Sequence, residues 1–137
     1  MSKFSFAKST ILEVPVTQCD IERCIKRGNG RLFKIIDERA QHRRWIIYFQ
    51  IFDASLRPPR DIEITWDVPI FNPITGAMLT MQELRAVWRG AYRGIHASFV
   101  QLEYGIKTPA QVFHPYIYNS SSGLTLFQSS KALKLIA

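Results

Sequence analysis

The chain has 137 residues, of which 47% are hydrophobic and 21% charged, a composition typical of a folded domain rather than of a disordered segment. Its 18 lysines and arginines outnumber its 11 aspartates and glutamates, so the formal net charge is +7, which favours an anionic partner. No apolar run approaches the roughly 20 residues of a membrane-spanning helix, and the N-terminal residues lack the apolar run of a secretory signal, so we expect a cytoplasmic protein.

The N-terminal part of the chain predicts a strand followed by a helix. Side chains alternate over residues 10–16, which favours a short strand that Pro15 either places at a sheet edge or ends. Residues 17–20 have the form of a capping box, so we expect a short helix over residues 18–27, closed by Gly28.

Three further strands are predicted in the middle of the chain. A turn at residues 28–30 leads into a β-rich run at residues 31–38, and residues 39–43 are expected to form a polar loop. Residues 44–53 carry apolar side chains on both faces, which predicts a central strand. Residues 61–70 alternate cleanly between apolar and polar side chains, so this strand is expected to bury one face only.

A long helix is the most clearly marked element. The turn at residues 72–76 precedes a capping box formed by Thr80 and Glu83, and apolar residues then recur at helical spacing until Gly105. Beyond the helix we predict a strand, a serine-rich loop, a short strand and a frayed or disordered tail, at residues 111–118, 119–123, 124–128 and 129–137 respectively.

These elements predict an α+β fold in a single domain over residues 1–137. One antiparallel sheet of about five to six strands is expected, with one long helix packed across it and a short N-terminal helix. The short connections between consecutive strands favour hairpins, because parallel strands would need more crossover helices than the sequence provides.

A line of basic side chains along the long helix is the first candidate binding surface. Arg85, Arg89 and Arg93 recur at every fourth residue and His96 completes the line, so the four side chains form one ridge, called the arginine ridge below. Guanidinium groups bind phosphates bidentately, and such a ridge could track a row of them. The alternative is a solvated helix edge whose arginines pair with local carboxylates or lie over aromatic rings.

A basic segment over residues 23–44 is the second candidate surface. Its cations are interleaved with aromatic side chains, and single-stranded nucleic acid binds such surfaces through phosphates on cations and bases on rings. A solvated surface whose acidic neighbours offset part of the charge is the alternative. The residues of this segment predicted to contact nucleic acid are Arg27, Arg31, Lys34, Arg43 and Arg44.

The long helix also carries four small residues spaced by four, Ala86, Gly90, Gly94 and Ser98, called the small-residue stripe below. A glycine inside a helix costs about 1 kcal/mol relative to alanine, so we expect a close packing partner. That partner is either the protein's own sheet or first helix, or a second copy in a two-fold helix-on-helix dimer.

Catalytic and metal sites find little support in the sequence. The three histidines are isolated, and the two cysteines, expected as reduced thiols, form no Cys-x-x-Cys pair, so no zinc site or cofactor is predicted. An acidic strip of Asp61, Glu63 and Asp67 could hold a divalent metal on the outer face of its strand. Two histidines could cleave a phosphodiester by general acid–base chemistry, but nothing in the sequence places His96 near His114.

We therefore expect a small, basic, non-enzymatic domain that associates with nucleic acid through the arginine ridge and the basic segment. An alternative from another class is an adaptor module that self-associates or docks an acidic protein, through the small-residue stripe or an exposed sheet edge. A metal-dependent or histidine-based hydrolase is the third hypothesis.

Overall fold

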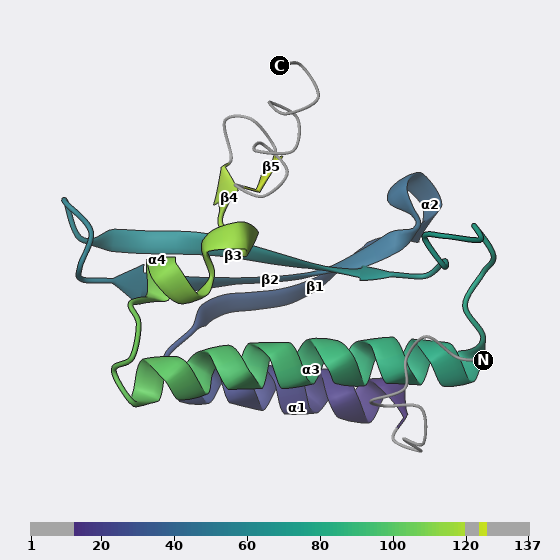
Figure 1. The fold of residues 1–137 in the computed structure, drawn as a ribbon, viewed down its shortest axis with the longest axis horizontal. Helices are drawn as coiled ribbons and strands as arrows, with labels where there is room; N and C mark the ends of the chain where they lie inside the picture. Colours follow the sequence, from purple (N-terminus) through teal and green to yellow (C-terminus); the bar gives the residue numbers. More distant parts are fainter. Residues whose placement is uncertain (1–12, 120–123, 126–137) are drawn as a thin grey trace.

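In a computed structural model, which describes residues 13–119 and 124–125, two helices cover one face of a three-stranded antiparallel sheet (Figure 1). The helices of this layer are α1 (Val14–Arg27) and α3 (Met81–Glu103), and the strands are β1 (Arg31–Glu38), β2 (Arg44–Asp53) and β3 (Arg60–Pro69), in the order β1-β2-β3. The shorter elements are α2 (Arg39–His42), α4 (Pro109–Val112), the 3-10 helix η1 (His114–Tyr116), β4 (Tyr118–Asn119) and β5 (Leu124–Thr125).

The α+β class is as expected, but the main sheet has three strands rather than about five to six. One predicted strand is missing because residues 14–16 form the first turn of α1. Pro15 fits there because the first N–H groups of a helix have no partner inside it. Thr17, which we expected to cap the helix, is instead buried within it. The part of that predicted strand before Glu13 lies outside the described residues.

The strand predicted over residues 111–118 is also wrong for most of its length. Thr108 and Gln111 form a capping box that begins α4, and η1 follows it, so the backbone is helical up to Tyr116. Only the last residues of the predicted strand have an extended backbone: Ile117 bridges to Ile64 on β3, and β4 begins at the next residue.

The structure describes only part of the region for which the remaining C-terminal predictions were made. The short strand predicted over residues 124–128 is present at β5, which pairs with β4. Residues 120–123, 126–128 and 129–137 lie outside the described residues.

The elements with the clearest sequence patterns are confirmed. β2 spans the predicted residues and is the central strand, and α3 begins with the predicted capping box between Thr80 and Glu83. The predicted polar loop at residues 39–43 contains one short helix, α2, after which Arg43 takes the left-handed conformation with φ of 55°. Both cysteines are free, as expected.

The core lies between the sheet and the α1–α3 layer. Trp88 of α3 is fully buried and packs against Trp45 of β2, with ring centroids 5.5 Å apart. Phe49 of β2 meets both Phe99 of α3 and Phe113, at centroid distances of 5.9 and 5.5 Å. Burial of these large rings, together with the aliphatic side chains of the same core, stabilises the fold, since stabilisation grows with the apolar area removed from water.

The helices α1 and α3 lie side by side and run in the same direction, so their C-terminal ends meet at one end of the molecule (Figure 1). The face of the sheet that points away from them is called the open face below, and the β4–β5 hairpin projects on this side, next to β3 (Figure 1). Within the part of the chain that the structure describes, no helix is both long and apolar enough to span a bilayer.

Candidate functional site

The first half of the arginine ridge faces α1 rather than solvent. Arg85 Nη2 lies 2.8 Å from Glu13 Oε1, and Arg89 Nη1 lies 2.8 Å from Asp20 Oδ2. The two arginine side chains are only 26% and 18% exposed. They therefore join α1 to α3, and the row of solvent-facing cations that the helical spacing predicted is not formed at these two positions.

The second half of the ridge, Arg93 and His96, is exposed. His96 stacks against Tyr92 with ring centroids 5.7 Å apart, and the guanidinium of Arg89 lies 4.3 Å from the same ring. Of this second half, His96 borders a pocket, and the ring of Tyr92 lies between it and the ion-paired Arg89.

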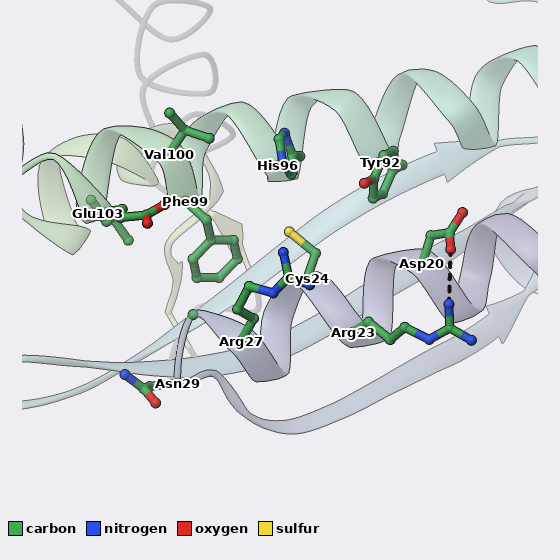
Figure 2. A pocket seen from close by; sticks show the side chains of 12 residues that line it. Asp20, Arg23, Cys24, Arg27, Asn29, Tyr92, His96, Phe99, Val100 and Glu103 are labelled. Atoms are coloured by element: carbon green, nitrogen blue, oxygen red, sulfur yellow. Dashed lines mark ion pairs between the residues drawn. The ribbon is translucent and has the colours of Figure 1, made fainter.

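This pocket, called the groove pocket below, has a volume of about 510 Å³ and lies between the C-terminal halves of α1 and α3 (Figure 2). Arg23, Arg27 and Asn29 line it on the side of α1, and Arg27 extends toward Cys24 and the facing helix (Figure 2). The rings that line it on the side of α3 are those of Tyr92, His96 and Phe99. Cations on one wall therefore face rings on the other.

Close packing at the end of α1 sets the shape of the pocket floor. A Cβ atom on Gly28 would lie 2.2 Å from the Phe99 ring, so only glycine allows α1 to end against α3 here. The turn continues through Asn29, whose φ of 64° is left-handed, and into β1. Asn29 is thereby placed at the rim of the groove pocket.

The groove pocket has both signs of charge. Arg23 is 77% exposed and lies 3.6 Å from one oxygen of Asp20, whose other oxygen pairs with Arg89 at 2.8 Å. Arg27 is exposed, and none of the carboxylates of the described residues pairs with it. Its position in the last turn of α1 is favourable, since cations offset the negative end of the helix dipole. Glu103 contributes one exposed carboxylate at the end of α3.

Cys24 lies in the same wall as Arg27. Burial raises the pKa of the Cys24 thiol, and the charge of Arg27 opposes that shift only in part. Since the thiolate rather than the thiol is nucleophilic, a raised pKa makes Cys24 less reactive than an ordinary cysteine.

The other predicted nucleic-acid contacts lie away from the groove pocket. Lys34 lies over the ring of Tyr48 at 4.7 Å, and Arg43 lies over Phe71 at 4.8 Å. Arg31 pairs with Asp61. The structure does not bring these cations together with Arg27 and His96.

Arg44 is also committed to neighbouring acids. It pairs with Glu38 at 3.0 Å and with Asp67 at 3.1 Å. Ile35 and Ile47 pair with each other and face the helices, so by alternation Lys34, Glu38 and Arg44 lie on the open face. The basic segment is thus divided between opposite sides of the sheet.

The small-residue stripe packs mainly within the fold. A Cβ on Gly94 would lie 2.8 Å from the Trp66 ring of β3, and the hydroxyl of Ser98 donates a hydrogen bond to the Gly94 carbonyl at 2.9 Å. Ala86 is buried, whereas Gly90 is exposed and faces open space. The protein's own sheet is therefore the close partner that the stripe requires at Gly94.

The acidic side chains of the strip on β3 each contact a neighbouring side chain and are not grouped into a metal site. Asp61 pairs with Arg31 and Asp67 with Arg44, while Glu63 accepts a hydrogen bond of 2.8 Å from the Tyr48 hydroxyl. Burial raises the pKa of Asp67, and Arg44 opposes that shift. Among the described residues, no group of three or more histidine, cysteine, aspartate or glutamate side chains is placed to hold a metal ion.

Sequence reasoning missed most of the groove pocket. Arg27 and His96 were predicted as contacts, but Asn29, Tyr92 and Phe99 were not singled out. Tyr92 and Phe99 recur at helical spacing with the apolar face of α3, which predicts core residues, and Phe99 is in the core with Tyr92 packed against it. Both also line the pocket. The pocket forms because α1 and α3 pack side by side, and the spacing of residues along one helix does not show which element packs against it.

Comparison of the chain with protein-family models, with curated proteins and with solved structures finds no match.

Proposed function

We propose that the protein is a nucleic-acid-binding domain whose contact site is the groove pocket. The observation that carries this proposal is the pairing of exposed cations, Arg23 and Arg27, with the rings of Tyr92 and His96 across one pocket. Nucleic acid offers the complementary pair of groups, a phosphate and a flat base, at a fixed short separation.

Arg23 and Arg27 suit a phosphate because they are exposed and neither forms a close ion pair with the described carboxylates. A guanidinium stays charged at every physiological pH and presents several donors in one plane, which matches the oxygens of a phosphate. Arg23 holds Asp20 only loosely, and Arg27 projects into the pocket. Arg85 and Arg89, by contrast, are committed to α1 and are assigned a structural role.

The aromatic wall suits an unstacked base. Stacking of a base on an aromatic side chain contributes about 1–3 kcal/mol and tolerates any base. A volume of about 510 Å³ is within the range of small-ligand pockets, which is roughly 300–1,000 Å³, so a nucleotide unit fits. Single strands are therefore the expected substrate, since their bases are available for stacking and those of a duplex are not.

The small number of free cations predicts a weak salt dependence. Each phosphate contact to a single strand makes the slope of log affinity against log salt about 0.7 more negative, so two arginines predict a slope near −1.4. Fluorescence anisotropy with a labelled single-stranded oligonucleotide, titrated at several salt concentrations, measures both affinity and slope.

Matched variants make this measurement specific to the groove pocket. Arg27→Gln and Arg23→Gln are each expected to lower the affinity and to make the slope about 0.7 less steep. Arg57→Gln removes the same charge from the loop between β2 and β3, which does not line the pocket, and leaves the slope unchanged. An affinity that stays flat with salt and is the same in all three variants would refute the proposal.

A further comparison separates nucleic acid from other polyanions. Heparin carries sulfates but no bases, so it is expected to compete poorly if the rings of the groove pocket take part. Equal competition by heparin, together with full affinity in Tyr92→Leu, would instead assign the site to a polyanion such as an acidic protein surface.

A further inference from the structure

Strand β1 is an edge strand. Among the described residues it pairs with β2 on one side and with no strand on the other. An unpaired edge presents a row of backbone N–H and C=O groups that can accept another strand, and proteins commonly protect such edges.

The side chains of β1 do not have the pattern of an edge that stays in water. Phe33 and Ile35 pack toward the core, and Ile36 lies on the open face, so both faces carry apolar groups, all of them only half-buried. A strand with apolar residues on both faces is usual inside a sheet and unusual at its edge.

Only part of the strand is regular enough to pair. The register with β2 shifts between Arg31 and Lys34, and Leu32 within that bulge has a φ of 54°. From Lys34 to Glu38 each residue faces its partner on β2 without interruption. The stretch available to a further strand is therefore the segment of residues 34–38.

The charges of this segment favour one pairing with a second copy. In an antiparallel pair about a two-fold axis perpendicular to the sheet, the central residue faces its own copy. With Ile36 at the centre, Lys34 faces Glu38 of the second copy at both ends, on the open face. Centring on Lys34 or on Asp37 would place like charges opposite each other, which is unfavourable.

We propose that β1 pairs antiparallel with β1 of a second copy, centred on Ile36, so that two three-stranded sheets join into one continuous sheet. The pairing brings Ile36 against its own copy and closes two ion pairs between Lys34 and Glu38. The exposed Lys34 side chain lies over Tyr48, and Glu38 keeps its contact with Arg44 on the same face. This interface is separate from the groove pocket, so the pairing can be tested independently of nucleic-acid binding.

Sedimentation velocity over a range of protein concentrations tests the proposal directly. The wild-type chain, of 15.8 kDa, is expected to reach twice that mass as concentration rises. Lys34→Glu and Glu38→Lys each place like charges at both ends of the pairing, so each variant alone is expected to associate about tenfold more weakly.

Mixing the two variants gives the decisive result. A Lys34→Glu chain has two acids at the paired positions and a Glu38→Lys chain has two lysines, so a one-to-one mixture is expected to form the mixed dimer at wild-type strength. Native mass spectrometry distinguishes this mixed dimer from either homodimer. Lys107→Glu, a charge reversal outside the strand, is the control and is expected to self-associate like the wild type.

Circular dichroism of each variant checks that the fold is retained, because Glu38→Lys also removes a partner of Arg44. If either variant fails to fold, Ile36→Lys replaces it, since two lysines at the centre weaken the pairing without touching Arg44. A wild-type chain that stays monomeric at every concentration overturns the proposal, as does a mixture that associates no better than its components.

Discussion

Asp53, the last residue of β2, accepts a hydrogen bond of 2.8 Å from the backbone N–H of Ala110, in the first turn of α4. The first N–H groups of a helix have no partner within the helix, and this carboxylate supplies one from the sheet. The other oxygen of Asp53 accepts from the backbone N–H and the hydroxyl of Ser55, at 2.8 and 2.5 Å. With Asp53 only 1% exposed, this one side chain fastens the segment after α3 to the end of the sheet.

Removing that carboxylate is expected to destabilise the protein. In Asp53→Ala the N–H groups of Ser55 and Ala110 lose their acceptor while partly buried, which costs about 2–3 kcal/mol of the free energy of unfolding. Asp53→Asn keeps one acceptor oxygen and is expected to cost less. Urea denaturation measures both values. Glu103→Ala, at an exposed position, is the control and is expected to change the free energy by less than about 0.5 kcal/mol.

The same site predicts a pH dependence. Burial raises the pKa of Asp53, but the hydrogen bonds from Ser55 and Ala110 outweigh it and leave the pKa below its ordinary value of 3.8. Because the pKa is lower in the folded state, the stabilisation is complete above about pH 4 and is lost as the pH falls through the folded value. The difference in unfolding free energy between wild type and Asp53→Asn should therefore shrink below pH 4. A difference that grows on acidification contradicts this assignment.

Two glycines of the small-residue stripe are expected to respond to alanine in opposite directions. Gly90 faces open space, so Gly90→Ala should stabilise the protein by about 0.5–1 kcal/mol through helix propensity alone. Gly94→Ala places a Cβ 2.8 Å from the ring of Trp66, which is stacked on Tyr116 at 4.0 Å and cannot retreat without breaking that stack. A loss of about 1–3 kcal/mol is expected from such overpacking.

Thermal or urea unfolding of the two variants side by side checks this pair. The substitution is chemically the same at both positions and lies on the same helix, so each variant is the control of the other. If both were destabilising by similar amounts, Gly90 would have a packing partner outside the described residues, such as a second copy.

The contrast between β2 and the segment after α3 shows what the sequence could predict. β2 could be predicted because it has apolar residues on both faces, a pattern that fits a central strand. α3 could be predicted because a capping box is followed by apolar residues at helical spacing, which fits a helix. Residues 111–118 are rich in side chains that favour strands, and this composition hid the capping box of Thr108 and Gln111. Likewise Pro15 is compatible with a strand end and with the first turn of a helix, and the structure has the second.

The arginine ridge shows why the candidate site was harder to predict than the fold. Spacing correctly placed Arg85 and Arg89 on one side of the helix, but it does not reveal what lies opposite. Their partners, Glu13 and Asp20, are 72 and 69 residues away along the chain and reach them only because α1 and α3 pack together. Because tertiary packing places these two carboxylates opposite Arg85 and Arg89, the two arginines link the helices and do not form a solvent-facing binding surface.

That link can be measured with a double-mutant cycle on Arg89 and Asp20. The pair is partly buried, with side chains 18% and 25% exposed, so we expect a coupling free energy of about 1 kcal/mol, at the upper end of values for surface pairs. Urea denaturation of Arg89→Met, Asp20→Asn and the double variant gives the coupling. A coupling near zero would mean that the contact does not stabilise the packing of α1 on α3.

Asp37 and Arg39 test local electrostatics at the start of α2. The guanidinium of Arg39, followed by its backbone N–H, donates hydrogen bonds to Asp37 and lowers the pKa of that carboxyl from 3.8 to about 2. NMR titration of the Asp37 carboxyl carbon measures this value. Arg39→Ala removes the larger contribution, so the pKa should return toward 3.8, and an unchanged pKa in that variant would rule out the ion pair in solution. The lowered pKa implies stabilisation that is complete above about pH 4 and lost as the pH falls toward 2.

Alkylation of the two cysteines reports on the electrostatics of the groove pocket. Cys19 is exposed, whereas Cys24 is half-buried with a raised pKa, so at pH 8 N-ethylmaleimide should modify Cys19 first. Arg27→Met keeps an unbranched apolar stem but removes the charge that lowers the pKa of Cys24. The alkylation rate of Cys24, followed by mass spectrometry against pH, should therefore rise at a higher pH in this variant than in the wild type. An identical pH profile would mean that Arg27 points away from the pocket in solution, and the phosphate contact proposed for it would fail with it.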